Sequence, residues 1–114
     1  MHIHDDSFRL ARARLLARGA ELRERIVRVR ADLKREQEPV PADFTEAAVR
    51  LENDEVLQAI ETAATAELGH VEHALASLDA GTFGSCESCG KRIDAQRLEI
   101  VPYAARCPDC ESRR

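Results

Sequence analysis

Aromatic residues are nearly absent from this sequence of 114 residues, which contains no Trp, one Tyr and three Phe. Because large aromatic side chains contribute much of the buried area of globular cores, a thick globular core is not expected. Ala, Leu, Glu and Arg are the commonest residues, and such a composition is typical of long helices. The length allows one compact domain, or a small module attached to a helical element.

Long apolar runs are also missing. No stretch approaches the ~18 apolar residues that a membrane-spanning helix needs, and the first residues lack the apolar segment of a signal peptide. We therefore expect a cytoplasmic protein that has no contact with a membrane. In that compartment the four cysteines are better explained as metal ligands than as a disulfide framework.

An excess of basic residues is missing as well, since 17 Lys and Arg stand against 21 Asp and Glu, a net charge of −4. This balance argues against a uniformly basic nucleic-acid binder. The charges are unevenly distributed: residues 1–35 contain ten basic and five acidic side chains, and residues 36–80 contain one and eleven. The contrast predicts that these two segments lie side by side with ion pairs along their flanks, each worth well under ~1 kcal/mol.

Apolar residues in the first segment recur at coiled-coil spacing, so we expect a helix from Phe8 to Arg35. One row repeats every seven residues and consists of Phe8, Leu15, Leu22 and Val29. A second row, displaced by four residues, consists of Gly19, Ile26 and Leu33. Pro39 and Pro41 then prevent the helix from continuing.

A second helix is expected from Thr45 to Asp79, where apolar residues are spaced three or four apart: Leu57, Ile60, Ala64, Leu68, Val71, Leu75 and Leu78. The short connection requires the two helices to run antiparallel. The predicted fold is mainly α, with an antiparallel coiled-coil hairpin over residues 1–80 whose tip lies near 36–48, followed by a small C-terminal module over 81–114.

The cysteines of this module have the spacing Cys86-x2-Cys89-x17-Cys107-x2-Cys110, which is that of a four-thiolate zinc site. Each pair can turn its sulfurs to one side of a tight knuckle and occupy two corners of a tetrahedron. Four protein thiolates leave no open coordination position, so we expect one structural Zn²⁺ rather than a catalytic one. Two disulfides, a thioredoxin-like redox pair and a rubredoxin-like iron site are the alternatives.

The segment after the hairpin resembles the C4 zinc finger of the DksA/TraR family of bacterial RNA polymerase-binding transcription factors. The pattern FGxCxxCGxxIxxxRLExxPxAxxCxxC is matched at Phe83, Gly84, Cys86, Cys89, Gly90, Ile93, Arg97, Leu98, Glu99, Pro102, Ala104, Cys107 and Cys110. The resemblance implies a non-enzymatic regulator of transcription that places its hairpin in the secondary channel of RNA polymerase. It also implies that acidic residues at the hairpin tip act near the active centre of the polymerase.

The resemblance also identifies candidate residues at the tip. Active family members carry an Asp-x-x-Asp-x-Ala pattern, and the residues at the same distance before the first cysteine are Asp43, Glu46 and Ala48. Without the resemblance, the two acidic residues would be interpreted as helix-start carboxylates favoured by the helix dipole.

Members that bind the alarmone ppGpp use basic residues at three positions, and the corresponding residues are His70, Val101 and Glu111. Because a polyanion needs fixed cations, we predict a weak or absent response to ppGpp. His70 and His73 lie one helical turn apart and lack a third metal ligand, so we interpret them as solvated residues.

Two other classes of function remain open. One is a zinc-ribbon protein that binds nucleic acid without polymerase; the other is an interaction module that associates with itself. Basic and acidic residues alternate along the predicted finger, so we expect no direct sequence-specific binding to DNA. We further expect a monomer.

Overall fold

A computed structural model describes residues 5–35 and 43–113 of the chain. Four helices follow in order: α1 (Asp5–Arg35), α2 (Phe44–Ala80), α3 (Ala95–Ile100) and α4 (Pro108–Ser112). Within the described ranges no strand forms, although Ser85 and Arg92 make an isolated antiparallel bridge. None of these helices is both long and apolar enough to cross a membrane.

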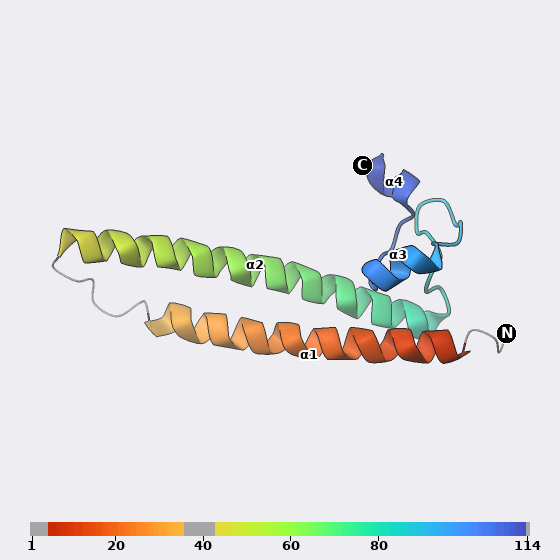
Figure 1. Ribbon diagram of the computed structural model, residues 1–114, viewed down its shortest axis with the longest axis horizontal. Coiled ribbons are helices and arrows are strands. Elements are labelled where there is room, and N and C mark those ends of the chain that lie inside the picture. The colour runs from red at the N-terminus through yellow and green to blue at the C-terminus, as the bar shows by residue number, and fades with distance from the viewer. Residues whose placement is uncertain (1–4, 36–42, 114) are drawn as a thin grey trace. The chain divides into compact units, whose positions relative to one another are not determined.

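The two long helices pack as an antiparallel hairpin, which confirms the predicted fold class (Figure 1). The first helix begins three residues earlier than predicted, at Asp5, because none of residues 5–7 is a Gly or Pro that would stop it. The second helix extends the predicted range by one residue at each end. Most of the predicted tip, residues 36–42, lies outside the described residues.

By internal packing the chain forms two compact units, and each contains a stretch of both long helices. One unit comprises residues 20–68; the other comprises residues 1–19 and 69–114. These units are defined by packing and do not test the predicted division of the chain into residues 1–80 and 81–114, which stays a prediction.

The core of the 20–68 unit consists of buried residues of both helices, namely Leu22, Ile26, Val29 and Ala64. In the other unit Leu15 of α1 and Val71 and Ala74 of α2 are buried, and Cys86 and Ile93 are buried in the finger. Leu15, Leu22 and Val29 belong to the predicted seven-residue row, so this row is the buried face of α1. Ile60 was expected on the buried face of α2 but is 37% exposed.

Ion pairs cross the hairpin as the uneven charge distribution predicted. Arg12 Nη2 lies 2.9 Å from Asp79 Oδ1 in one unit, and the Arg30 guanidinium contacts Glu61 in the other. The 18-residue step from Arg12 to Arg30 along α1 equals the step from Asp79 back to Glu61 along α2. The pairing register is therefore the same at both pairs.

This register leaves the beginning of α2 without a partner on α1. With Arg30 beside Glu61, the last residue of α1, Arg35, falls opposite Val56. Figure 1 shows the first turns of α2 extending beyond the end of α1. Large apolar side chains are exposed in this stretch, namely Phe44, Val49, Leu51 and Val56.

The end of α2 is fixed by a glycine in the left-handed region. Gly81 has φ +79°, its N–H donates to the carbonyl of Leu78, and the N–H of Thr82 donates to the carbonyl of Ser77. These two bonds form a Schellman motif, which satisfies carbonyls at a helix end. The chain therefore leaves α2 at a defined residue and enters the finger.

Candidate functional site

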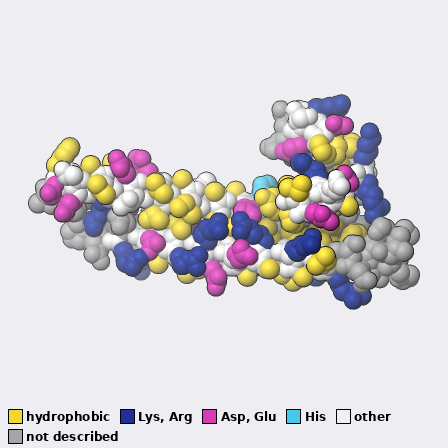
Figure 2. Space-filling view, viewed as in Figure 1, with side chains coloured by type: hydrophobic (Ala, Val, Ile, Leu, Met, Phe, Trp, Pro, Cys, Tyr) yellow, Lys and Arg dark blue, Asp and Glu magenta, His cyan; other side chains and the backbone are white. Residues whose placement is uncertain are grey.

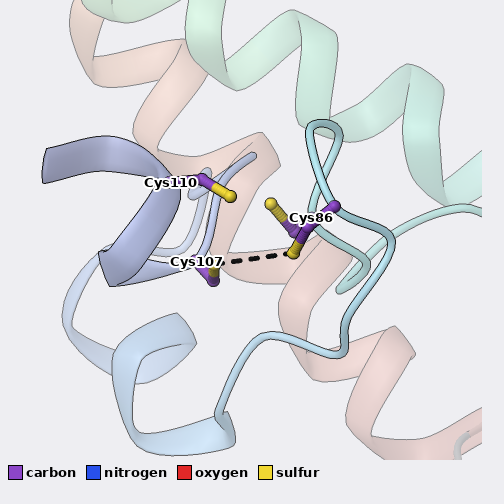
Figure 3. Close-up of side chains that lie close together, drawn as sticks. Cys86, Cys107 and Cys110 are labelled. Atoms are coloured by element: carbon purple, nitrogen blue, oxygen red, sulfur yellow. Dashed lines mark hydrogen bonds between the residues drawn. The ribbon is translucent and has the colours of Figure 1, made fainter. Parts of the chain in front are cut away.

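The four cysteines of the finger converge on one point. Their sulfur atoms all lie within 4.8 Å of one another, and the Sγ atoms of Cys89 and Cys107 are 3.8 Å apart. A tetrahedron with zinc–sulfur distances of ~2.3 Å has edges of about 3.8 Å. The sulfurs of Cys86, Cys107 and Cys110 point toward one another from the loop after α2 and from α4 (Figure 3). The cluster therefore suits one zinc ion.

The disulfide alternative does not fit this geometry. All four cysteines are free, and the 3.8 Å separation of Cys89 and Cys107 is far longer than the ~2.05 Å sulfur–sulfur bond of a disulfide. Four converging thiols are a donor set that prefers zinc or iron, and a tetrahedral four-sulfur site leaves no position for a substrate. Such a centre stabilises a fold and has no catalytic coordination position.

The first pair of cysteines sits on a tight turn closed by backbone hydrogen bonds. The N–H of Gly90 donates to the carbonyl of Cys86 at 2.9 Å, and the N–H of Cys86 donates to the carbonyl of Lys91 at 2.8 Å. Gly90 has φ +78°, which a residue with a Cβ adopts at a cost. The Cys-x2-Cys-Gly sequence therefore builds the knuckle, as the spacing predicted.

The second pair is positioned by the start of α4. Cys107 is the N-cap, Pro108 occupies the first turn, and Cys110 follows one turn later on the helix. Pro is favoured there because its missing N–H has no partner in the helix anyway. A hydrogen bond from the N–H of Glu87 to the carbonyl of Ala105, at 2.9 Å, ties the first knuckle to the irregular segment that leads to the second.

The thiols of the cluster hold their protons unequally. The backbone N–H of Cys107 donates to the sulfur of Cys86 and, with the N–H groups of Cys89 and Ser88, lowers the pKa of Cys86 to about 6. The pKa of Cys110 is raised to about 12, chiefly because its thiol hydrogen-bonds to the side chain of Cys107. Four neighbouring thiolates repel one another, so a bound divalent cation is needed before all four can ionise.

The finger also contacts α2 through two histidines, both of which are exposed, as expected for solvated residues. His73 Nε2 pairs with a carboxylate oxygen of Glu87, and the ring of His70 stacks on Tyr103 with a centroid distance of 5.5 Å and an angle of 11°. Glu87 lies between Cys86 and Cys89, so this contact joins α2 to the first knuckle. Spacing along α2 shows which residues share a face, but the partners come from a loop whose path the pattern does not encode.

The described residues of the predicted tip lie at the beginning of α2. Asp43 precedes the helix, and its carbonyl accepts the N–H of Ala47 at 3.0 Å. Its carboxylate lies near the N–H of Glu46, at 3.4 Å, as expected for an N-cap. The side chains of Asp43, Glu46 and Ala48 are all exposed. The structure thus bears out a local role for Asp43, and a role in partner binding stays a prediction.

Two family models together match most of the chain. The model of the prokaryotic dksA/traR C4-type zinc finger matches residues 81–114, and the model of the DnaK suppressor protein-like N-terminal domain matches residues 12–78. The second match alone covers more than half of the chain.

Individual relatives agree with these matches. An uncharacterized protein of Aquifex aeolicus is 28% identical over 99 residues, which are 85% of this chain and 68% of that protein. The RNA polymerase-binding transcription factor DksA of Haemophilus influenzae is 43% identical over 42 residues, but this match spans 37% of this chain and 29% of that protein. The match to this named factor therefore covers less than a third of its length.

Two solved structures are similar over nearly the whole chain. The transcription factor DksA2 from Pseudomonas aeruginosa superposes with a TM-score of 0.80 at 26% identity, covering 93% of this chain and 81% of that one. The DnaK suppressor protein from Agrobacterium tumefaciens has a TM-score of 0.63 at 36% identity, covering 93% and 92%.

Proposed function

Because this chain belongs to the DksA/TraR family, which includes RNA polymerase-binding transcription factors, we propose that it binds RNA polymerase and regulates transcription. In this proposal the hairpin enters the secondary channel and its acidic tip, Asp43 and Glu46 with Ala48, modulates initiation. The zinc ligands are Cys86, Cys89, Cys107 and Cys110. The protein acts in the cytoplasm, as a monomer, and without catalysis of its own.

The observation that carries the proposal is the exposed beginning of α2. Its first turns extend beyond α1 and present two carboxylates together with apolar side chains, among them Phe44, which is 88% exposed. Acidic groups beside apolar side chains suit a protein surface better than the phosphate backbone of a nucleic acid. Among the three classes of function considered, a protein partner therefore fits this part of the molecule best.

The zinc finger gives little support to direct DNA binding. Two of its basic residues have interactions of their own: Arg106 lies 3.9 Å from Glu111, and Arg92 also has a partner. Acidic residues stand between the basic ones, so no continuous basic stripe forms. We therefore assign the finger a structural task, which is to tie the ends of the two long helices together through zinc and through contacts such as that between His73 and Glu87.

A response to ppGpp is not part of this proposal. His70 stacks on Tyr103, Val101 is an uncharged half-buried residue, and Glu111 adds a negative charge beside Arg106. These three positions supply no permanent cation to a polyphosphate. We expect the effect of the protein on transcription to be the same with and without ppGpp, apart from the effect of ppGpp on the polymerase itself.

The test uses the zinc-loaded full chain, purified core RNA polymerase and a run-off transcription assay. The double variant Asp43→Asn with Glu46→Gln should bind the polymerase as the wild type does and lose most of the effect on transcription. The control variant Glu24→Gln with Glu72→Gln removes two exposed carboxylates of the long helices away from the beginning of α2 and should keep both properties. A photo-crosslinking amino acid at Ala48 should label the large subunits of the polymerase.

Two results would contradict the proposal. Failure of the zinc-loaded wild type to bind core polymerase without DNA removes its basis altogether. An unchanged effect of the Asp43/Glu46 variant on transcription removes the assignment of the tip while leaving polymerase binding in place.

A further inference from the structure

A cavity of about 520 Å³ opens in the unit that contains the finger, away from the cysteine cluster. Its walls come from the beginning of α1, from the turn that follows α2, and from α3 with the loop that precedes it. Figure 2 shows apolar side chains gathered around α3 and the neighbouring end of the hairpin, with charged side chains among them. The volume falls within the range of ~300–1,000 Å³ that is usual for small-molecule sites.

The inner wall of the cavity is apolar and well ordered by packing. Phe8 and Phe83 meet edge to face with ring centroids 5.7 Å apart and an interplanar angle of 83°. Ile93, which is buried, and Leu98 complete this wall. The small side chain of Ala11 borders the same space, so room remains for an apolar group of a ligand. An apolar body placed here would lose contact with water on the side that faces this wall.

The rim of the cavity carries charges of both signs. Arg14 on α1 and Arg92 on the finger both line it, together with Asp94 and Glu99. Asp94 is occupied as the N-cap of α3, where its Oδ1 accepts the N–H of Gln96 at 3.5 Å. Arg14 has no ion pair within the residues that the structure describes, and a guanidinium is the side chain best suited to grip a carboxylate with two parallel hydrogen bonds.

We propose that this cavity binds a small amphipathic anion, with its apolar body against Phe83 and Leu98 and its single acidic group at Arg14. The acidic group is a carboxylate or sulfonate and the body is an acyl chain or an aromatic ring. Glu99 keeps the net charge of the rim low, so a molecule with several phosphates is disfavoured. This site goes beyond the proposed regulation of transcription and does not depend on it.

The first experiment measures binding to the zinc-loaded full chain. The dye 8-anilinonaphthalene-1-sulfonate combines aromatic rings with one sulfonate and becomes fluorescent in an apolar site. Decanoate and 2-naphthoate then compete in separate arms, which distinguishes an acyl chain from a ring. We expect saturable dye binding and displacement by at least one of the two carboxylates. Absence of saturable binding, or displacement by neither carboxylate at millimolar concentration, overturns the proposal.

Matched variants locate the site. Ala11→Phe fills the cavity and should weaken dye binding at least about tenfold, whereas Ala20→Phe, at an exposed alanine of the same helix, should not. Ala95→Phe fills the cavity from α3 and serves as an independent variant if Ala11→Phe does not fold. Unchanged affinity in the folded filling variants overturns the assignment of the site.

Charge variants test the sign of the ligand. Arg14→Gln should weaken binding about tenfold, as expected when a charged hydrogen-bond partner is lost, while Arg28→Gln on the same helix leaves it unchanged. Glu99→Gln should tighten binding of the anion because it removes a repulsive charge from the rim. Tighter binding by Arg14→Gln, or weaker binding by Glu99→Gln, contradicts an anionic ligand.

Discussion

Oδ1 of Asp43 accepts a hydrogen bond from the backbone N–H of Thr45 at 2.7 Å, so the acidic residue at the proposed tip is also the N-cap of α2. Capping the helix and acting on a partner place different requirements on this side chain. Capping requires an acceptor oxygen, which Asn also provides, whereas an electrostatic effect on a partner requires the negative charge. Substitutions can therefore separate stability from activity at this one position.

For the cap of α2, we predict that Asp43→Ala lowers the free energy of unfolding by about 1 kcal/mol, since an orphan N–H of the first turn loses its acceptor. Asp43→Asn should change it by no more than a few tenths of a kcal/mol. Urea unfolding followed by circular dichroism at 222 nm measures both. Equal losses in the two variants would mean that charge, not the cap, stabilises this helix end.

For the hairpin core, we predict that Leu22→Ala lowers the free energy of unfolding by about 2–5 kcal/mol, because Leu22 is fully buried and the surroundings cannot close the cavity completely. The matched variant Leu16→Ala removes the same atoms from a side chain that is 53% exposed, and should cost far less. The same urea titration compares them. Similar costs for the two leucines would show that Leu22 is not in the core.

Removal of zinc should unfold the finger and leave the hairpin core of residues 20–68 helical. Zinc binding supplies ~10–16 kcal/mol in zinc-finger peptides, more than the few buried apolar residues of this finger can replace. In a two-dimensional NMR spectrum, chelation should collapse the amide signals of residues 85–110, while those of Leu22, Ile26 and Ala64 stay dispersed. Cys89→Ser should reproduce this collapse without a chelator, and Ser88→Ala, one residue away, should not. Dispersed finger signals in a metal-free sample would contradict the structural role of zinc.

Zinc affinity should fall as the pH falls. The ion binds thiolates, so every thiol that is still protonated releases its proton when zinc binds. At neutral pH this includes Cys110, whose pKa is raised to about 12, whereas Cys86, whose pKa is lowered to about 6, is already ionised. Below about pH 6 the thiol of Cys86 must also lose a proton when zinc binds. The zinc affinity should therefore change more steeply with pH in that range. Competition with a chromophoric chelator between about pH 5 and pH 8 measures the slope, and a flat profile would contradict the proton release.

The hairpin could be predicted from the sequence because its information is local and periodic. Leu15, Leu22 and Val29 repeat every seven residues and are the buried face of α1, and charge complementarity predicted contacts such as that between Arg12 and Asp79. The same reasoning was wrong for Ile60, which is exposed. Apolar spacing shows which residues lie near one face of α2, but it does not determine how much of the Ile60 side chain the facing helix covers.

The metal cluster could be predicted because two short cysteine motifs determine most of its geometry. The contacts of His70 and His73 could not be predicted in this way. Their partners, Tyr103 and Glu87, lie on irregular segments whose course is determined by the zinc cluster and by left-handed glycines. No periodic pattern links these segments to α2.

Because the register between α1 and α2 is the same at both ion pairs, facing segments of the two helices can be removed together. Seven residues can be deleted from each helix at facing positions without changing which side chains point inward, because two helical turns take up nearly seven residues. Each such paired deletion would shorten the two helices by about 10 Å and leave the finger and the beginning of α2 with their own sequences. A graded series of these deletions would relate the distance that the helices span to the activity of the protein, one step at a time.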